Sequence, residues 1–223
     1  MESKSKDDYI YELIDYIRSM DYILPEDIPN IDLYMDQVTT FMDEHLQSSK
    51  RYMADKIMTK TMINNYTKND LLPSPNKKKY SKEHILLLIF IYYFKNFLSI
   101  SDIQSILEPL IKGFYNDMGE INLQSVYTEV FGLLHDNMNS LTKNVIRDLN
   151  KAKESFSQVE NEAERDFLTN FAYICMLSFD VYVKKMMIEK LLDNSYPSSL
   201  KKAVPAERSS SKAQVKKEKP AQD

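Results

Sequence analysis

The sequence predicts an all-α protein in which a minimal β-wing is the only place for strands. Three observations support this prediction: helix-forming residues are abundant, apolar residues recur at helical spacing, and the 223-residue chain has only three glycines. Glycine-rich phosphate loops and the tight turns that carry catalytic serines cannot be written anywhere in such a sequence. The hydrophobic content of 43% is sufficient for a real core.

Two helices are expected before the first polar loop. Residues 7–20 carry apolar side chains at helical spacing, and two prolines follow them. A second helix is expected over residues 33–47, with Asp32 as its N-cap. Residues 49–58 are polar, and the sequence leaves their structure open.

Three further helices are expected in the middle of the chain. Thr59 or Thr61 opens a short one, which a segment with two prolines ends. Ser81 caps the next, whose apolar surface extends nearly all round, as in a helix packed on several sides. Ser99 or Ser101 then caps another helix.

The C-terminal half is also predicted to be helical. Pro109 should kink or break the helix that contains it, and residues 141–156 form a polar stretch between helical segments. A long helix over residues 160–192 has an apolar face, for which core packing or a dimer seam is favoured over a pocket for an apolar effector. The single cysteine, Cys175, is interpreted as a buried core thiol. The apolar face contains Phe167, Phe171, Ile174, Val181 and Ile188.

Charge is distributed unevenly along the chain. Its net charge is −4, and residues 1–49 alone carry a net charge of −9. Residues 50–82 carry 9 basic and 2 acidic side chains, a net charge of +7. Because contacts with phosphates depend on local charge, this basic segment is where a nucleic-acid interface is expected.

The short helix within the basic segment has a polar side suited to base edges. Asn64 and Asn65 can each pair with adenine through two hydrogen bonds, and Thr61 and Lys68 add further hydrogen-bonding groups. These four residues are the predicted base contacts. The predicted phosphate contacts are the neighbouring basic side chains and one tyrosine, and the lysine trio is expected to act as a wing beside the groove. They are Arg51, Lys60, Lys77, Lys78, Lys79, Tyr80 and Lys82.

Residues 59–107 resemble the winged helix-turn-helix of MerR-type regulators. The resemblance rests on Met62 and Ile63 in the short helix and on motifs that follow it. Asp70 stands where that pattern has glycine, and Asn64 where it has arginine. The other matching residues are Leu71, Leu72 and Pro73, then Tyr80, Ser81 and His84, then Leu98 to Ile103.

Residues 31–110 more closely resemble a bacterial family known as domain of unknown function 1836, which carries a MerR-like head. The resemblance implies a regulator with no known effector. Together with the composition of the remaining segments, this predicts four parts: an N-terminal helix and linker (1–30), the helix-turn-helix domain (31–110), a helical body (111–195) and a disordered basic tail (196–223).

The expected function is sequence-specific binding of duplex DNA by a homodimer that regulates transcription, since one short helix reads too few base pairs alone. The alternative is a protein-protein adaptor that kept the helix-turn-helix shape without DNA activity. His84 is open to a phosphate contact, although packing is favoured for it.

An enzyme is disfavoured, because no catalytic residue, metal site or cofactor is indicated, and His135 beside Asp136 has no further ligand at metal spacing. No signal peptide or membrane-spanning run is visible, so a cytoplasmic protein without membrane contact is expected.

Overall fold

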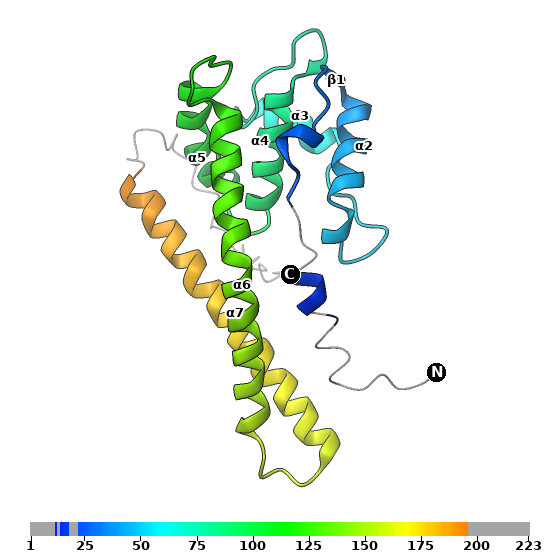
Figure 1. Cartoon of the computed structure of the whole chain (residues 1–223), viewed down its shortest axis with the longest axis vertical. Coiled ribbons are helices and arrows are strands. Elements are labelled where there is room, and N and C mark those ends of the chain that lie inside the picture. The colour runs from blue at the N-terminus through cyan, green and yellow to red at the C-terminus, as the bar shows by residue number, and fades with distance from the viewer. Residues whose placement is uncertain (1–11, 13, 18–21, 196–223) are drawn as a thin grey trace, which may run out of the picture.

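The structure is a computed structural model that describes residue 12, residues 14–17 and residues 22–195, and it is mostly helical, as predicted (Figure 1). Most of the expected helix over residues 7–20 and all of the expected tail from residue 196 lie outside the described residues. Within the described residues from 22 onward, the α-helices are α2 (Met35–His45), α3 (Lys60–Lys68), α4 (Lys82–Phe94), α5 (Ile100–Phe114), α6 (Leu123–Ser155) and α7 (Glu162–Ser195). Two 3-10 turns, η1 (Pro25–Asp27) and η2 (Gln47–Ser49), and two strands, β1 (Leu33–Tyr34) and β2 (Lys79–Tyr80), complete the order of elements.

The helix α4 lies at the centre of the hydrophobic core. Every residue from His84 to Tyr92 is buried, which explains why its sequence shows no polar side. Helices α5 and α6 pack against it, and buried side chains of α2 and α3 join the same core. We call residues 22–114 the head, because they form one end of the molecule around this helix (Figure 1).

The helix α6, which lies outside the head, contributes side chains to the core of the head. Tyr127 and Phe131 of α6 are buried against Phe90 of α4. The Tyr127 hydroxyl donates a 2.7 Å hydrogen bond to the carbonyl oxygen of Ile23. The start of the head is therefore fixed to α6, and the predicted boundary between residues 110 and 111 falls inside α5.

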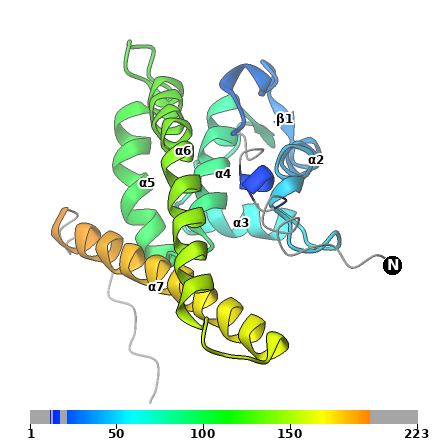
Figure 2. The same cartoon turned by 60° about the horizontal axis from the view of Figure 1, so that its bottom comes forward.

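The helices α6 and α7 form a long antiparallel hairpin that projects from the head (Figures 1 and 2). Residues 141–156 were predicted to separate two helical segments. This prediction is wrong, because α6 is continuous from Leu123 to Ser155. Only Thr142, Leu149 and Ala152 are buried in its second half, and these lie near one face of the helix. One narrow contact with α7 is thus compatible with an otherwise polar sequence.

Local signals fix several helix ends as predicted. Thr59 caps α3, and its hydroxyl accepts a hydrogen bond from the backbone N–H of Met62. Ser99 caps α5 in the same way. Of the kink or break expected at Pro109, the break does not occur, because α5 continues through this exposed proline to Phe114.

The two strands form a minimal antiparallel ribbon. Leu33 pairs with Tyr80, and Tyr34 pairs with Lys79. The segment after Asp32 therefore enters a strand first, and α2 begins at Met35 with Tyr34 as its N-cap. This ribbon is a tiny two-stranded sheet, consistent with the mainly helical fold class that was predicted.

Candidate nucleic-acid interface

The helix α3 is held to the head by one side and exposes the other. Ile63 and Tyr66 are buried, while Met62 and Thr67 are half-buried beside them. The exposed side contains the four predicted base contacts, all of which are solvent-exposed. At 100° per residue they fall within an arc of about 100°, opposite the buried side chains. This set, Thr61, Asn64, Asn65 and Lys68, is called the α3 face below.

The end of α3 is fixed by a left-handed residue. Asp70 has φ of +55°, and the N–H of Leu71 donates a 2.9 Å hydrogen bond to the carbonyl oxygen of Tyr66. A second bond joins the N–H of Asp70 to the carbonyl oxygen of Thr67 at 3.3 Å. This pair of bonds is a Schellman motif, in which glycine is usual at the left-handed position. The aspartate at this position therefore keeps a backbone conformation that favours glycine.

The lysine trio lies on a tight hairpin turn. The N–H of Lys79 donates a 2.9 Å hydrogen bond to the carbonyl oxygen of Asn76, which closes a four-residue turn. The central residues Lys77 and Lys78 have φ of +47° and +66°. Two positive φ values are the signature of a type I′ turn, for which Asn-Gly is favoured. Both lysine side chains are exposed. We call residues 76–79 the lysine turn.

The remaining predicted phosphate contacts differ in their exposure to solvent and in the contacts that their charged groups already make. Lys60 forms an exposed ion pair with Asp36 of α2. Lys79 lies with its ammonium 5.3 Å from the centre of the Tyr34 ring. Arg51 is exposed beside the ring of Tyr52, and Lys82 is half-buried at the start of α4. An exposed pair such as the one at Lys60 is weak enough for a phosphate to replace the carboxylate.

Tyr80 does not belong in the predicted set of phosphate contacts. Its side chain is only 3% exposed, and its ring packs edge-on against His84 at a centroid distance of 5.5 Å. The strand alternation explains the error, because Lys79 and Tyr80 point to opposite faces of the ribbon. The hydroxyl-bearing ring fills the core side, and the preceding lysine faces outward.

His84 is a packing residue, as the favoured interpretation held. Its Nδ1 accepts a 3.0 Å hydrogen bond from the backbone N–H of Ser81 at the start of α4. Burial lowers the pKa of His84, while hydrogen bonds to the backbone of Ser74 and Pro73 act in the opposite direction. The neutral ring thus joins α4 to the segment that leads into the lysine turn.

The segment between α2 and α3 is long but anchored. Ile57 and Met58 are buried, and the ammonium of Lys95 in α4 donates a 2.7 Å hydrogen bond to the carbonyl oxygen of Ile57. Lys50 forms a 2.7 Å ion pair with Asp43, and this contact holds the pKa of the Asp43 carboxyl below its usual range. A hollow of about 690 Å³ lies beside this segment, lined mainly by polar residues of α2, the segment and the start of α3.

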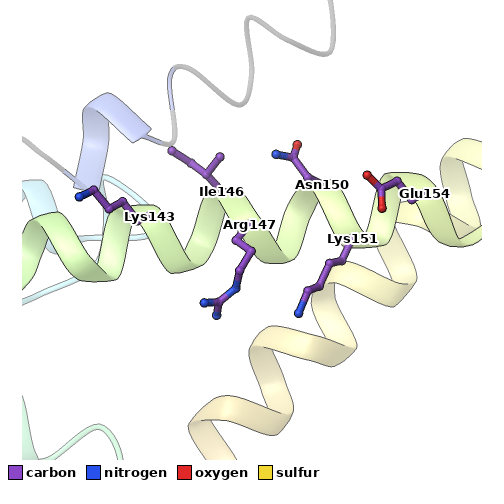
Figure 3. Close-up of a pocket in the computed structure, with 6 residues that line it drawn as sticks. All are labelled: Lys143, Ile146, Arg147, Asn150, Lys151 and Glu154. Carbon is purple, nitrogen blue, oxygen red and sulfur yellow. The ribbon is translucent and has the colours of Figure 1, made fainter.

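A second group of basic side chains was missed by the sequence reasoning. Lys143, Arg147 and Lys151 follow one another at intervals of four residues along α6, beside a hollow of about 410 Å³ (Figure 3). The spacing was readable in the sequence as a row on one helix face. It was missed because this stretch was interpreted as a polar interruption.

The described residues offer no cluster of three or more His, Cys, Asp or Glu side chains that could hold a metal ion. Within the same part of the chain, no helix combines the length and apolar character that crossing a membrane requires.

In a comparison with known proteins, one family model matches the head and the start of α6. No curated protein and no solved structure matches the chain. Residues 23–130 match the model of the family described as Domain of unknown function (DUF1836). The matched segment contains the α3 face, the lysine turn and the central helix α4. The segment from Ile23 to Val130, just under half of the chain, is therefore similar to the DUF1836 family.

Proposed function

We propose that the head binds duplex DNA sequence-specifically and that the protein regulates transcription. In this proposal α2, α3 and the β1–β2 ribbon act as a MerR-like winged helix-turn-helix, with α3 in the major groove. The observation that carries the proposal is the α3 face, where four uncharged or basic hydrogen-bonding side chains share one exposed side of a firmly anchored helix.

The residues of the α3 face have distinct roles in this proposal. Asn64 and Asn65 read adenine through paired hydrogen bonds, since an amide both donates and accepts. Lys68 contacts guanine or a phosphate, and Thr61 contacts a neighbouring base edge. The phosphate contacts are Arg51, Lys60, Lys77, Lys78, Lys79 and Lys82, without Tyr80.

The lysine turn gives independent support. Lys77 and Lys78 occupy positions whose positive φ disfavours ordinary side chains by about 1 kcal/mol or more each. Strained positions of this kind are concentrated at functional sites. Charged side chains at the tip of a turn are suited to phosphates beside a groove.

One observation favours an adaptor that contacts proteins. Helix-turn-helix units join their two helices by a turn of three or four residues, whereas residues 46–59 separate α2 from α3 here. This anchored segment lies next to the start of α3 and has its own polar hollow. An adaptor would use that surface and would show no affinity for DNA.

The experiment is fluorescence anisotropy with a labelled duplex from the region upstream of the protein's own gene, compared with a scrambled duplex across a salt series. Asn64→Ala/Asn65→Ala should reduce the preference for the upstream duplex by about 30-fold or more, because two bidentate pairs together supply about 2–6 kcal/mol of discrimination. Asn139→Ala/Asn144→Ala, which removes two exposed amides from α6, is the matched control and should change nothing.

Salt separates DNA binding from the adaptor. Phosphate contacts make the logarithm of affinity fall with the logarithm of salt concentration, by about 0.9 per phosphate neutralised. Flat anisotropy with both duplexes at low salt would end the DNA proposal and favour the adaptor.

A further inference from the structure

The helix α7 presents an apolar surface that nothing in the described chain covers. Its exposed apolar side chains include Phe179, which is 67% exposed, and Ile174, which is 61% exposed. Cys175 is exposed among them, so its interpretation as a buried core thiol is wrong. We call this set the α7 stripe, and it consists of Phe167, Phe171, Ile174, Cys175, Phe179, Val181, Tyr182 and Met186.

The α7 stripe is continuous and free of charge over its central turns. At 100° per residue its members fall within an arc of about 160°. The acidic residues of the same stretch, Asp166 and Asp180, lie outside that arc. Ser178 and, near its C-terminal end, Lys185, which pairs with Glu189, lie inside it. Core packing, which the sequence also allowed, is excluded for Phe167, Phe171, Ile174 and Val181, because these side chains face away from α6 and the head.

The area of the α7 stripe approaches that of a stable protein interface. Its four aromatic side chains are each more than half exposed, which amounts to about 500 Å² of aromatic surface. A standard interface uses about 800 Å² on each partner. The aliphatic residues of the stripe and its polar borders account for the remainder. Monomeric proteins rarely expose an apolar patch of this size.

The charges at the two ends of α7 indicate which partner fits. The N-terminal end carries exposed acidic residues, Glu162 and Glu164, preceded by Glu160. The C-terminal end, residues 184–193, carries Lys184, Lys185 and Lys190 with Glu189 and Asp193, a net charge of +1, and its first two lysines pair within the helix with Asp180 and Glu189. A second α7 in the antiparallel direction places the acidic end against this weakly positive end, whereas a parallel one places the two acidic ends together. A reversed copy therefore fits the charge distribution of α7 better than a parallel one.

We propose that two copies of the chain pair through their α7 stripes, antiparallel, around a two-fold axis between Ile174 and Cys175. Phe167 of one copy then lies opposite Tyr182 of the other, and Glu164 lies opposite Lys185. The same patch serves both copies, as a closed two-fold dimer requires. This pairing does not depend on DNA binding by the head.

The first test is sedimentation velocity of the full chain over a range of concentrations. Ile174→Glu should raise the dissociation constant of the dimer at least about 100-fold, because it places an unpaired charge in the seam of each copy. Met187→Glu is the matched control, since Met187 is 60% exposed but lies about 140° around the helix from Ile174. Both residues are exposed in the protomer, so circular dichroism should show the helices intact in both variants.

The second test fixes the direction of pairing. Two single-cysteine variants are prepared, Cys175→Ser/Phe167→Cys and Cys175→Ser/Tyr182→Cys, one of them with a size tag. Under mild oxidation the antiparallel dimer should give a disulfide only when the two variants are mixed. Identical positions are separated by about 22 Å along the helix, far beyond the reach of a disulfide.

Two results would overturn the proposal. One is a wild-type chain that sediments as a monomer at tens of micromolar, or a dimer that Ile174→Glu leaves intact. The other is oxidation of each single-cysteine variant with itself, which would indicate parallel pairing. DNA anisotropy is an independent reading, because a monomeric chain with an intact α3 face still binds phosphates in a salt-dependent manner. Failure of either proposal therefore leaves the other open.

Discussion

Asp70 has a left-handed backbone conformation that residues with a side chain rarely adopt. Its φ of +55° closes the Schellman motif at the end of α3, where glycine has no steric penalty. We expect Asp70→Gly to raise the free energy of unfolding by about 0.5–1 kcal/mol, measured by urea denaturation. Asp70→Val, which places a β-branched side chain in the left-handed region, should lower it. Equal stability of all three proteins would contradict the geometry.

His84 should make stability depend on pH. Burial lowers its pKa from the usual 6.5, so the unfolded chain binds this proton more readily than the folded protein does. The stabilisation is therefore complete above pH 6.5 and is lost as the pH falls through that value toward the lower pKa of the folded state. The melting temperature of the wild type should fall between pH 7.5 and 5.5.

The variant His84→Gln isolates this contribution. An amide at this position can accept the bond from the backbone N–H of Ser81 but does not titrate. Its melting temperature should fall less over the same pH range. Because His45 and His135 are present in both proteins, the difference between the two pH dependences of the melting temperature reports on His84. A variant with the same pH dependence as the wild type would remove His84 as the cause.

Single residues were predictable where the signal is local. Thr59 and Ser99 were read correctly as caps, because capping depends on a side chain three residues from its partner. Tyr80 and Cys175 were misplaced, because burial depends on which neighbours fold against a side chain. An apolar helical face has the same spacing whether α6, the head or a second copy covers it.

At the scale of elements, the lysine turn offers a test that separates stability from function. Lys77→Asn/Lys78→Gly installs the residues that a type I′ turn favours. We expect the free energy of unfolding to rise by about 1 kcal/mol while affinity for DNA falls and its salt dependence becomes shallower by about two phosphate contacts. Urea denaturation and anisotropy on the same samples measure both.

A control makes the same change of charge away from the lysine turn. Lys143→Asn/Lys151→Gly removes two cations from α6, where glycine destabilises the helix and no DNA contact is proposed. It should lose stability and keep its DNA affinity. A turn variant that gained stability without any loss of affinity would show that the lysines do not touch phosphate.

Most of the helices could be predicted from the sequence, and the errors in their bounds have physical causes. The long C-terminal helix and α4 were predicted because sustained apolar spacing and Ser81 mark them. The continuity of α6 was not, since a helix that packs on one partner needs few apolar residues and resembles a polar linker. Pro109 removes one hydrogen bond on an exposed side of α5, and the packing of Ile103 and Leu107 outweighs that loss. The α3 face was readable from the sequence, whereas the ion pair between Lys60 and Asp36 required the fold.

For the whole molecule, the shared core makes the head depend on α6. Tyr127→Ala removes a fully buried ring and its hydrogen bond to Ile23, so we expect the free energy of unfolding to fall by about 3–5 kcal/mol. Urea denaturation of the full chain measures this, with Leu133→Ala as a control at an exposed position of the same helix. The control should stay within about 0.5 kcal/mol of the wild type. Similar losses in both variants would mean that α6 does not complete the core.

The hydrogen bond between Tyr127 and Ile23 joins residues 104 positions apart, and this separation has a consequence during synthesis. At roughly 5–20 residues per second, Ile23 is made some 5 to 20 s before its partner. The most apolar helix, α4, is complete once Phe94 is made, so its side toward Tyr127 and Phe131 has no cover for the last 33 residues of that interval, about 2 to 7 s. The nascent chain is thus most prone to aggregate before α6 emerges, and a holding chaperone would be needed in that window rather than after release.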